Sequence, residues 1–155
     1  MEVDIASANQ VLAEVRDVIH PNCRIAGSAN PEGLQLKFRM LDNGDIEADF
    51  ACEPRFQGYS EIVHGGVIAA MLDSAMVNSL FARRMNAVTA ELSVRYREPV
   101  KLNIVAKVRG RIEKMTARIY YMAADVWQDG LLCASARAKF MATPPAVDKV
   151  VDAAP

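Results

Sequence analysis

The sequence predicts an α+β fold, in which one long central helix packs on a six-stranded antiparallel sheet and a short helix precedes both. Three observations lead to this prediction. The apolar segment from Val67 to Arg84 spans 18 residues without Gly or Pro, enough for about five turns of helix. Segments of alternating apolar and polar residues lie before and after it, a pattern typical of strands. Short turns join these segments, and short turns connect antiparallel strands.

Length and composition indicate a soluble, globular protein. The chain has 155 residues, of which 52% are hydrophobic and 24% charged, and this suits one domain with its own core. A net charge of −1 gives no electrostatic basis for binding nucleic acid. We divide this single domain, 1–155, into an N-terminal helix and linker (1–33), a core (34–141) and a loose tail (142–155).

Cysteine spacing and the N-terminus bear on location. The three cysteines lie far apart and form no CxxC motif, so we expect neither a metal site nor a disulfide framework. The acidic N-terminus lacks the apolar core of a signal peptide. The central helix carries polar groups at its middle, where lipid would penalise them. We therefore expect a cytoplasmic protein that makes no membrane contact.

Before the central helix, the sequence predicts one helix and one hairpin. Ser7 and Gln10 have the spacing of a capping box, and apolar residues follow with helical period until Pro21 stops the helix. The segments 34–40 and 46–50 both alternate, and the Asp-Asn-Gly-Asp sequence between them is a strong hairpin turn.

After the central helix, four strands are predicted, at 88–97, 104–110, 116–127 and 131–141. Strict alternation in the first puts Val88 and Leu92 on one face and Thr89 on the other. Gly110 lies inside the second and predicts a bulge or a bend. We expect the chain to turn around 113–114.

The sequence His64-Gly65-Gly66 opens the central helix. Its two glycines let other groups approach the backbone closely. The first N–H groups of a helix have no partner within the helix and lie at the positive end of its dipole. They form a ready site for a carbonyl oxygen that gains negative charge, an oxyanion hole. The alternative is that these residues form only a tight turn into the helix.

His64 and Asp73 are candidate catalytic residues, each with a structural alternative. His64 is either an acid/base or a ring that caps or orients the loop. No Ser or Cys nucleophile is placed beside it, and no GxSxG motif is present. Asp73 lies in an apolar helix, where a carboxylate is costly unless it is paired or used. It is either a buried structural group or a general base or nucleophile.

The spacing of Gly65 and Asp73 has a consequence for assembly. Eight residues of helix separate them, which corresponds to about 12 Å along the axis. An oxyanion hole and a carboxylate that act on one carbonyl must both lie within a few ångströms of it. A catalytic site therefore requires two antiparallel copies of the helix, so we expect a dimer with shared sites.

The motif of His-Gly-Gly, six residues and Asp73, followed by the strand 88–99 (VTAELSVRYREP), resembles the hotdog-fold acyl-CoA thioesterases of the PaaI-like, phenylacetate-degradation type. The resemblance covers residues 34–141. It implies a six-stranded sheet wrapped around the central helix, a hotdog fold. It further implies active sites at a dimer interface, with dimers often paired into tetramers.

Site residues follow from the resemblance. Asp73 matches the catalytic carboxylate, which activates water or attacks the thioester. The Gly65 N–H matches the group that polarises the thioester carbonyl, and His64 matches the histidine that supports the thioester or leaving group. Thr89 matches a Ser/Thr that positions the water. Gly66, beside Gly65, is taken as a substrate-binding residue.

The resemblance also implies contacts with coenzyme A. Relatives carry an Asn or Gln on the loop before the His-Gly-Gly sequence; here Gln57 is the candidate, although strict offset gives Gly58. Basic side chains hold the CoA phosphates, and Arg97, Arg111 and Lys114 are candidates, each equally interpretable as a solvated charge.

The leading hypothesis is hydrolysis of an acyl-CoA to a carboxylic acid and free CoA, without a metal or redox cofactor, because an oxyanion hole and a water-orienting carboxylate suffice. One alternative is a hotdog dehydratase or hydratase, against which the Asp nine residues after His64 argues. Another is a non-catalytic acyl-CoA-binding or regulatory protein, which would not need Asp73.

Overall fold

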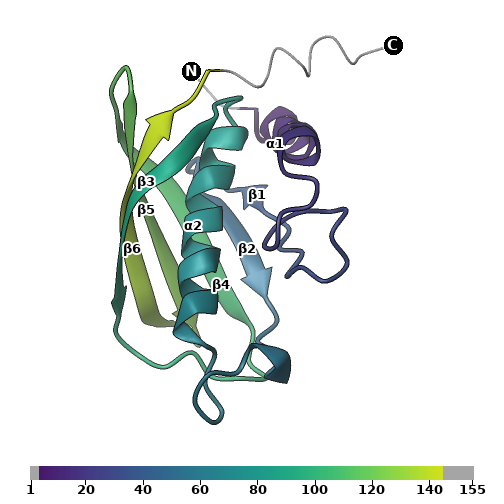
Figure 1. Ribbon diagram of the computed structural model, residues 1–155, viewed down its shortest axis with the longest axis vertical. Coiled ribbons are helices and arrows are strands. Elements are labelled where there is room, and N and C mark those ends of the chain that lie inside the picture. The colour runs from purple at the N-terminus through teal and green to yellow at the C-terminus, as the bar shows by residue number, and fades with distance from the viewer. Residues whose placement is uncertain (1–3, 145–155) are drawn as a thin grey trace.

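The structure, a computed structural model, describes residues 4–144. Its elements are α1 (Ile5–Ile19), β1 (Arg39–Met40), β2 (Ile46–Phe50), the 3-10 helix η1 (Pro54–Phe56), α2 (Gly65–Phe81), β3 (Ala87–Tyr96), β4 (Ala106–Met115), β5 (Ile119–Gln128) and β6 (Leu131–Ala142). The strands form one sheet in the order β1-β2-β4-β5-β6-β3, with every neighbouring pair antiparallel. The sheet curves around α2 (Figure 1). The predicted α+β fold of six antiparallel strands and a central helix is confirmed.

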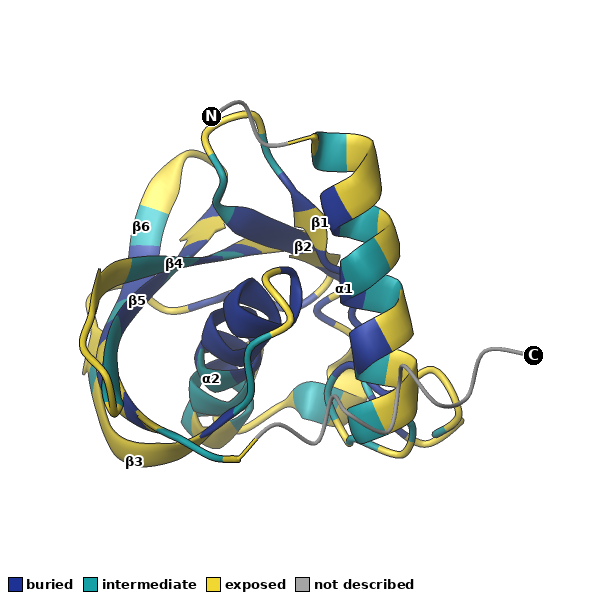
Figure 2. Ribbon diagram, turned by 90° about the horizontal axis from the view of Figure 1, so that it is seen from above, coloured by how far each residue is buried: buried dark blue, intermediate teal, exposed yellow. Residues whose placement is uncertain are grey.

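Helix α2 is the centre of the core because it is apolar on nearly every side. Met71, Leu72, Met76 and Leu80 have no exposed surface. An α-helix of this kind must be covered over most of its circumference, and the concave face of the sheet provides that cover. Figure 2 shows the buried helix lying inside the curve of the sheet, with β3 at the open edge.

Close contact between α2 and the sheet depends on Gly110. A Cβ atom at this position would lie 2.5 Å from the Ala75 carbonyl carbon and oxygen. Gly110 pairs regularly with Ile46 on one side and Ala124 on the other. The predicted bulge or bend at this glycine is therefore wrong: the residue is needed for the approach of the helix backbone.

Helix α1 packs beside β1 and α2 (Figure 1) and buries Ala8, Leu12 and Val15. Its N-cap is Asp4, whose side chain accepts a hydrogen bond from the Ala6 N–H at 3.2 Å. The expected capping box at Ser7 is therefore wrong, because the helix already begins at Ile5. An aspartate at the N-cap satisfies a helical N–H as well as a serine does.

Two strand boundaries differ from the sequence prediction. The segment 34–38 alternates in burial as predicted, but only Arg39–Met40 pairs with β2. The N–H groups of Leu34 and Leu36 instead donate to loop carbonyls at 24 and 25. The turn expected at 113–114 is a register shift within β4, and the chain turns at 116–119. A bulge and a turn both interrupt alternation, so the pattern alone did not separate them.

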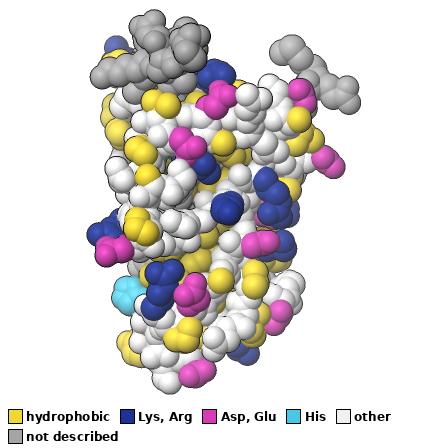
Figure 3. Space-filling view, turned by 90° about the vertical axis from the view of Figure 1, so that its right-hand side faces the viewer, with side chains coloured by type: hydrophobic (Ala, Val, Ile, Leu, Met, Phe, Trp, Pro, Cys, Tyr) yellow, Lys and Arg dark blue, Asp and Glu magenta, His cyan; other side chains and the backbone are white. Residues whose placement is uncertain are grey.

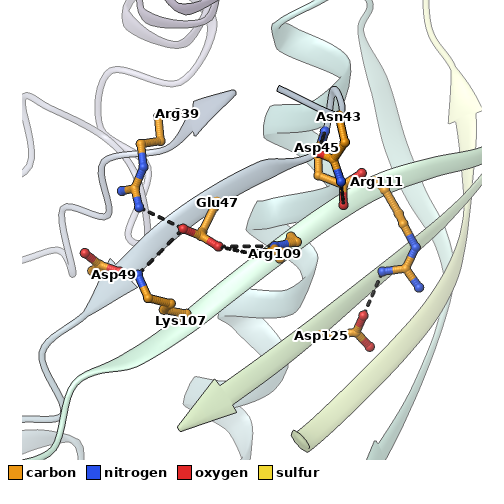
Figure 4. A network of polar contacts seen from close by, with 9 residues as sticks. All are labelled: Arg39, Asn43, Asp45, Glu47, Asp49, Lys107, Arg109, Arg111 and Asp125. Carbon is orange, nitrogen blue, oxygen red and sulfur yellow. Dashed lines mark hydrogen bonds and ion pairs between the residues drawn. The ribbon is translucent and has the colours of Figure 1, made fainter. Parts of the chain in front are cut away.

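On the face of the sheet away from α2, several charged side chains form ion pairs. The buried Glu47 carboxylate accepts from Arg39 at 2.7 Å and from Arg109 at 2.6 Å, and Lys107 lies 3.7 Å from it (Figure 4). A buried carboxylate requires such partners. Figure 3, a view of one side of the molecule, likewise shows acidic and basic side chains interspersed.

We expect Gly110→Ala to lower the free energy of unfolding by about 1–3 kcal/mol, because the new methyl group overlaps the α2 backbone. Urea unfolding followed by circular dichroism measures this change. Val105→Ala is the control, since Val105 is 57% exposed and its loss should change stability by no more than about 0.5 kcal/mol. Equal stability of the two variants would contradict the packing argument.

Candidate active site

The first turn of α2 presents one free backbone donor. His64 is the N-cap, and its Nδ1 accepts the Gly66 N–H at 2.9 Å. The neutral ring then carries its proton on Nε2. The Gly65 N–H makes no hydrogen bond to any of residues 4–144. Of the two glycine N–H groups, Gly65 is therefore available to a ligand and Gly66 is already bonded, and the capping role considered for His64 is observed.

Side chains from two other segments surround this turn. The Tyr96 O–H, near the end of β3, donates to the Gly65 carbonyl at 2.7 Å. Gln57, His64 and Gly65 line a common hollow of about 460 Å³. The Gln57 Oε1 accepts the Glu61 N–H at 3.2 Å, which holds the side chain in this loop. The structure thus brings Gln57 together with His64 and Gly65.

Asp73 lies further along α2 and is half-buried. Its Oδ1 accepts a hydrogen bond from the Thr89 hydroxyl at 2.7 Å. Burial raises the pKa of the Asp73 carboxyl, while the Thr89 hydrogen bond and the nearby His20 act in the opposite direction. No described residue donates to Oδ2. One hydrogen bond is little stabilisation for a half-buried structural carboxylate. Its second oxygen is available to a ligand or water.

A register shift in β3 brings Thr89 to Asp73. Thr89 pairs with the buried Phe140 and Glu91 with Lys139, so the strand has one extra residue, Ala90, between them. This shift puts Thr89 on the α2 side of the sheet, the same side as Leu92. Strict alternation had assigned Thr89 and Leu92 to opposite faces, and this part of the sequence prediction is wrong because a bulge reverses the order of faces.

Two residues near Asp73 were not predicted from the sequence. His20 and Cys23, from the segment that follows α1, line the same hollow of about 260 Å³ as Asp73 and Thr89. Hydrogen bonding with His20 lowers the pKa of the Cys23 thiol to about 7, with further help from the N–H groups of Ile25 and Ala26 and against the effect of burial. No motif in the sequence links residues 20–23 to residue 73, since only the folded chain brings them together.

Gly65 and Asp73 of one chain belong to different hollows. Both lie on α2, a single rigid helix, so they cannot converge on one carbonyl. Beside them, β3 is the last strand of the sheet, and one of its edges has no partner strand among residues 4–144. Val88 is 56% exposed, Leu92 36% and Tyr96 52%. An edge of this length and apolarity is a template for pairing with another strand.

The three candidate cationic residues separate into two groups. Arg97 and Arg111 line one hollow of about 430 Å³, together with Arg95 and Arg137. Arg111 is bonded to the Asp125 carboxylate at 2.7 Å (Figure 4). Lys114 is exposed outside this hollow, and its ammonium group lies 5.8 Å from the centre of the Tyr121 ring.

Within the described part of the chain, residues 4–144, no cluster of three or more His, Cys, Asp or Glu side chains is arranged to hold a metal ion. The cysteines Cys23, Cys52 and Cys133 are free thiols. None of the described helices has the length and hydrophobicity needed to span a membrane.

Comparison with known sequences shows a partial match to one family model. Residues 61–134 match the model of the thioesterase superfamily. The chain is 26% identical over 98 residues to acyl-coenzyme A thioesterase THEM4 of Bos taurus, covering 61% of this chain and 40% of that protein. It is 29% identical over 116 residues to THEM4 of Xenopus laevis, covering 71% and 52%. The chain therefore spans about half the length of these curated relatives.

Solved structures share the fold. The E. coli PaaI protein from the phenylacetic acid degradation operon superposes with a TM-score of 0.76 at 13% identity, covering 91% of this chain and 96% of that one. A phenylacetic acid degradation-related protein of Ralstonia eutropha gives 0.69 at 24% identity, covering 84% and 98%. A Streptococcus pneumoniae thioesterase with coenzyme A gives 0.66 at 17% identity, covering 71% and 90%. The hotdog fold implied by the sequence motif is confirmed.

We expect Asp73→Asn to raise the free energy of unfolding at pH 7 and to leave it unchanged at pH 3. The folded-state pKa lies above 3.8, so the unfolded chain releases this proton first as the pH rises, and the ionised carboxylate destabilises the folded state. At pH 3 both states hold the proton and the difference disappears. Urea unfolding at the two pH values measures this, and a less stable variant at pH 7 would indicate a structural carboxylate.

Proposed function

We propose that this chain, which has the hotdog fold and matches the thioesterase superfamily model over residues 61–134, is a member of that superfamily and hydrolyses acyl-CoA thioesters to a carboxylic acid and free CoA. The observation that carries the proposal is the half-buried Asp73 carboxylate, held by Thr89 at 2.7 Å with Oδ2 unpaired among the described residues. A carboxylate whose pKa is raised by burial is a better proton acceptor than one in water.

Asp73 and Thr89 together fit the task of activating water. The Thr89 hydroxyl donates its proton to Asp73, and its oxygen can still accept a hydrogen bond. A water molecule that donates to Thr89 Oγ1 and to Asp73 Oδ2 is fixed in position. Asp73 takes the proton as the water oxygen attacks the thioester carbon, and collapse of the tetrahedral intermediate releases the acid and the CoA thiolate. Direct attack by Asp73 on the thioester is the alternative, with an anhydride as intermediate.

The unpaired Gly65 N–H is the proposed oxyanion donor. It lies at the positive end of the α2 dipole, which favours the negative charge on the carbonyl oxygen in the intermediate. His64, with Nδ1 engaged by Gly66, retains Nε2–H to support the thioester or the leaving group. No metal or redox cofactor enters these steps.

Two copies of the chain are needed to assemble this site. On one chain, the Tyr96 end of β3 contacts Gly65 and the Thr89 end contacts Asp73. Antiparallel pairing of β3 with a second copy, centred near Leu92, lays the Thr89 end of one strand beside the Tyr96 end of the other. Asp73 of one chain then approaches Gly65 of its partner. We propose a homodimer with two shared sites, and we expect two such dimers to pair into a tetramer.

Similar proteins support the substrate class. The THEM4 relatives are named acyl-coenzyme A thioesterases, and the pneumococcal thioesterase was solved with coenzyme A. Two alanine variants of that pneumococcal protein were also solved, one at an aspartate and one at a threonine 16 positions further on (68 − 52). Asp73 and Thr89 have the same separation of 16, which supports treating them as a pair.

Arg97 is the preferred contact for the CoA phosphates. It follows Tyr96, whose hydroxyl bonds to the Gly65 end of the site, and its hollow contains three further arginines. Arg111 is weaker because Asp125 already neutralises it. Lys114 lies outside that hollow, so we rank it last.

We expect Asp73→Asn to lower kcat by about 10²–10⁴-fold, because the amide cannot accept the proton from water. Release of CoA thiol from a panel of acyl-CoAs measures this, and circular dichroism confirms that the variant folds. Asp49→Asn is the matched control, an exposed aspartate that pairs with Lys107 far from the site. Full activity of Asp73→Asn would contradict the mechanism, and no turnover by the wild type would favour a non-catalytic acyl-CoA-binding protein.

Gly65→Pro provides a test of the shared site. Proline at the first helical position is well tolerated, and His64 already has the extended conformation (φ −58°, ψ 132°) that proline requires of its predecessor. The substitution removes the N–H, and we expect kcat to fall about 10²–10³-fold. Gly65→Ala is the control, because it keeps the N–H and its Cβ would meet Tyr96 at an ordinary 3.5 Å.

Refolding Gly65→Pro and Asp73→Asn chains together should then restore activity. A mixed dimer contains one site with both functional groups, so an equal mixture should recover roughly a quarter of the wild-type rate. A mixture as inactive as its two components would mean that each site belongs to a single chain.

A further inference from the structure

The hollow beside Asp73 has a wall that the proposed reaction does not use. The segment 20–25, which follows α1, faces the start of β3 across this hollow of about 260 Å³. His20, Cys23 and Ile25 are the lining residues from that segment. They are the part of the N-terminal region closest to the proposed catalytic carboxylate.

Charge and polarity of the lining indicate which part of an acyl-CoA belongs here. Neither Lys nor Arg is among the described residues that line the hollow, and Ile25, Val77 and Val88 give it apolar surface. The phosphates of CoA need cationic partners, whereas an uncharged acyl group needs apolar contact. The hollow therefore suits the acyl group and excludes the CoA phosphates.

Its volume gives a scale for the acyl group. A cavity of roughly 150 Å³ in an apolar core accommodates benzene. The hollow, at about 260 Å³, has room for one aromatic ring with a short linker, or for a chain of medium length. A long-chain acyl group is larger than this volume.

The wall is held firmly enough to act as a limit. The His20 ring packs edge-on against Phe81, with ring centres 5.0 Å apart and planes at 89°. The Cys23 N–H donates to the His20 carbonyl at 3.2 Å, the Gly27 N–H donates to the Cys23 carbonyl at 3.0 Å, and the Cys23 Sγ accepts the Ile25 N–H at 3.4 Å. These contacts fix the position of the Cys23 side chain in the hollow.

We propose that the segment 20–25 closes the acyl end of the active site and that Cys23 is a specificity-determining residue that limits the size of the acyl group. This inference rests on the proposed thioesterase function. It adds that the favoured substrates carry an uncharged acyl group of about one aromatic ring or of medium chain length. Cys23 itself takes no part in the hydrolysis.

The first test narrows the hollow and measures kcat/KM for acetyl-, phenylacetyl-, octanoyl- and palmitoyl-CoA. Cys23→Leu should lower the value for phenylacetyl- and octanoyl-CoA about 10-fold or more and leave acetyl-CoA nearly unchanged. Cys23→Ala should improve palmitoyl-CoA relative to octanoyl-CoA. Arg24→Leu is the control, because its exposed side chain pairs with Glu32 outside the hollow. Equal effects of Cys23→Leu on all four substrates would overturn the proposal.

A second measurement keeps Cys23 native and needs no turnover. In the Asp73→Asn protein, iodoacetamide should alkylate Cys23 before the other two cysteines. The reaction forms a carbon–sulfur bond and releases iodide and the thiol proton. Cys52 and Cys133 should react more slowly because burial raises the pKa of the Cys52 thiol to about 11 and also raises the pKa of the Cys133 thiol. Phenylacetyl-CoA should slow this alkylation at least about fivefold, while S-methyl-CoA, which lacks an acyl group, should not.

The two tests distinguish failure of the proposed role of Cys23 from failure of the proposed thioesterase function. Protection by both CoA compounds, or by neither, would overturn the assignment of the hollow to the acyl group. A wild-type protein that hydrolyses none of the four acyl-CoAs would refute the proposed function, whereas hydrolysis with unaltered specificity in the Cys23 variants would refute only the role of Cys23.

Discussion

Burial of α2 is the constraint on which the rest of this structure depends. The helix is apolar around almost its whole circumference, and Met71, Leu72 and Met76 have no exposed surface. One flat sheet could cover only one side of such a helix. The sheet therefore curves around it, and Gly110 permits the close approach of the Ala75 backbone at the centre of the contact.

The same constraint determines where polar chemistry can occur. Helix α2 is incompletely covered at its N-terminal end and beside β3, and the Gly65 N–H and the half-buried Asp73 lie at these places. Burial raises the pKa of the Asp73 carboxyl, and its hydroxyl partner Thr89 offsets this rise only in part. The half-buried position of Asp73 thus results from its place at the edge of the apolar contact between α2 and the sheet.

One rigid helix also explains why the proposed site is incomplete in one chain. Gly65 and Asp73 are held apart by the helical rise, and each lines its own hollow. The exposed edge of β3 runs past both, with Tyr96 at one group and Thr89 at the other. A symmetric partner on this edge is the simplest arrangement that joins the two halves.

Local pattern determined much of this protein: the antiparallel strands, the central helix, the hairpin before it, the glycine turn at its start and the candidate residues Asp73, Gly65 and His64. These features follow from periodicity and backbone preferences, which depend on residues that are close together in the sequence. Only the tertiary structure decided the bulge at Ala90 that turns Thr89 toward Asp73, the role of Gly110 in packing, and the placement of His20 and Cys23 beside the carboxylate. The reason is physical: alternation describes each strand by itself, whereas register shifts and contacts between distant segments depend on which partner each backbone group and side chain finds in the folded chain.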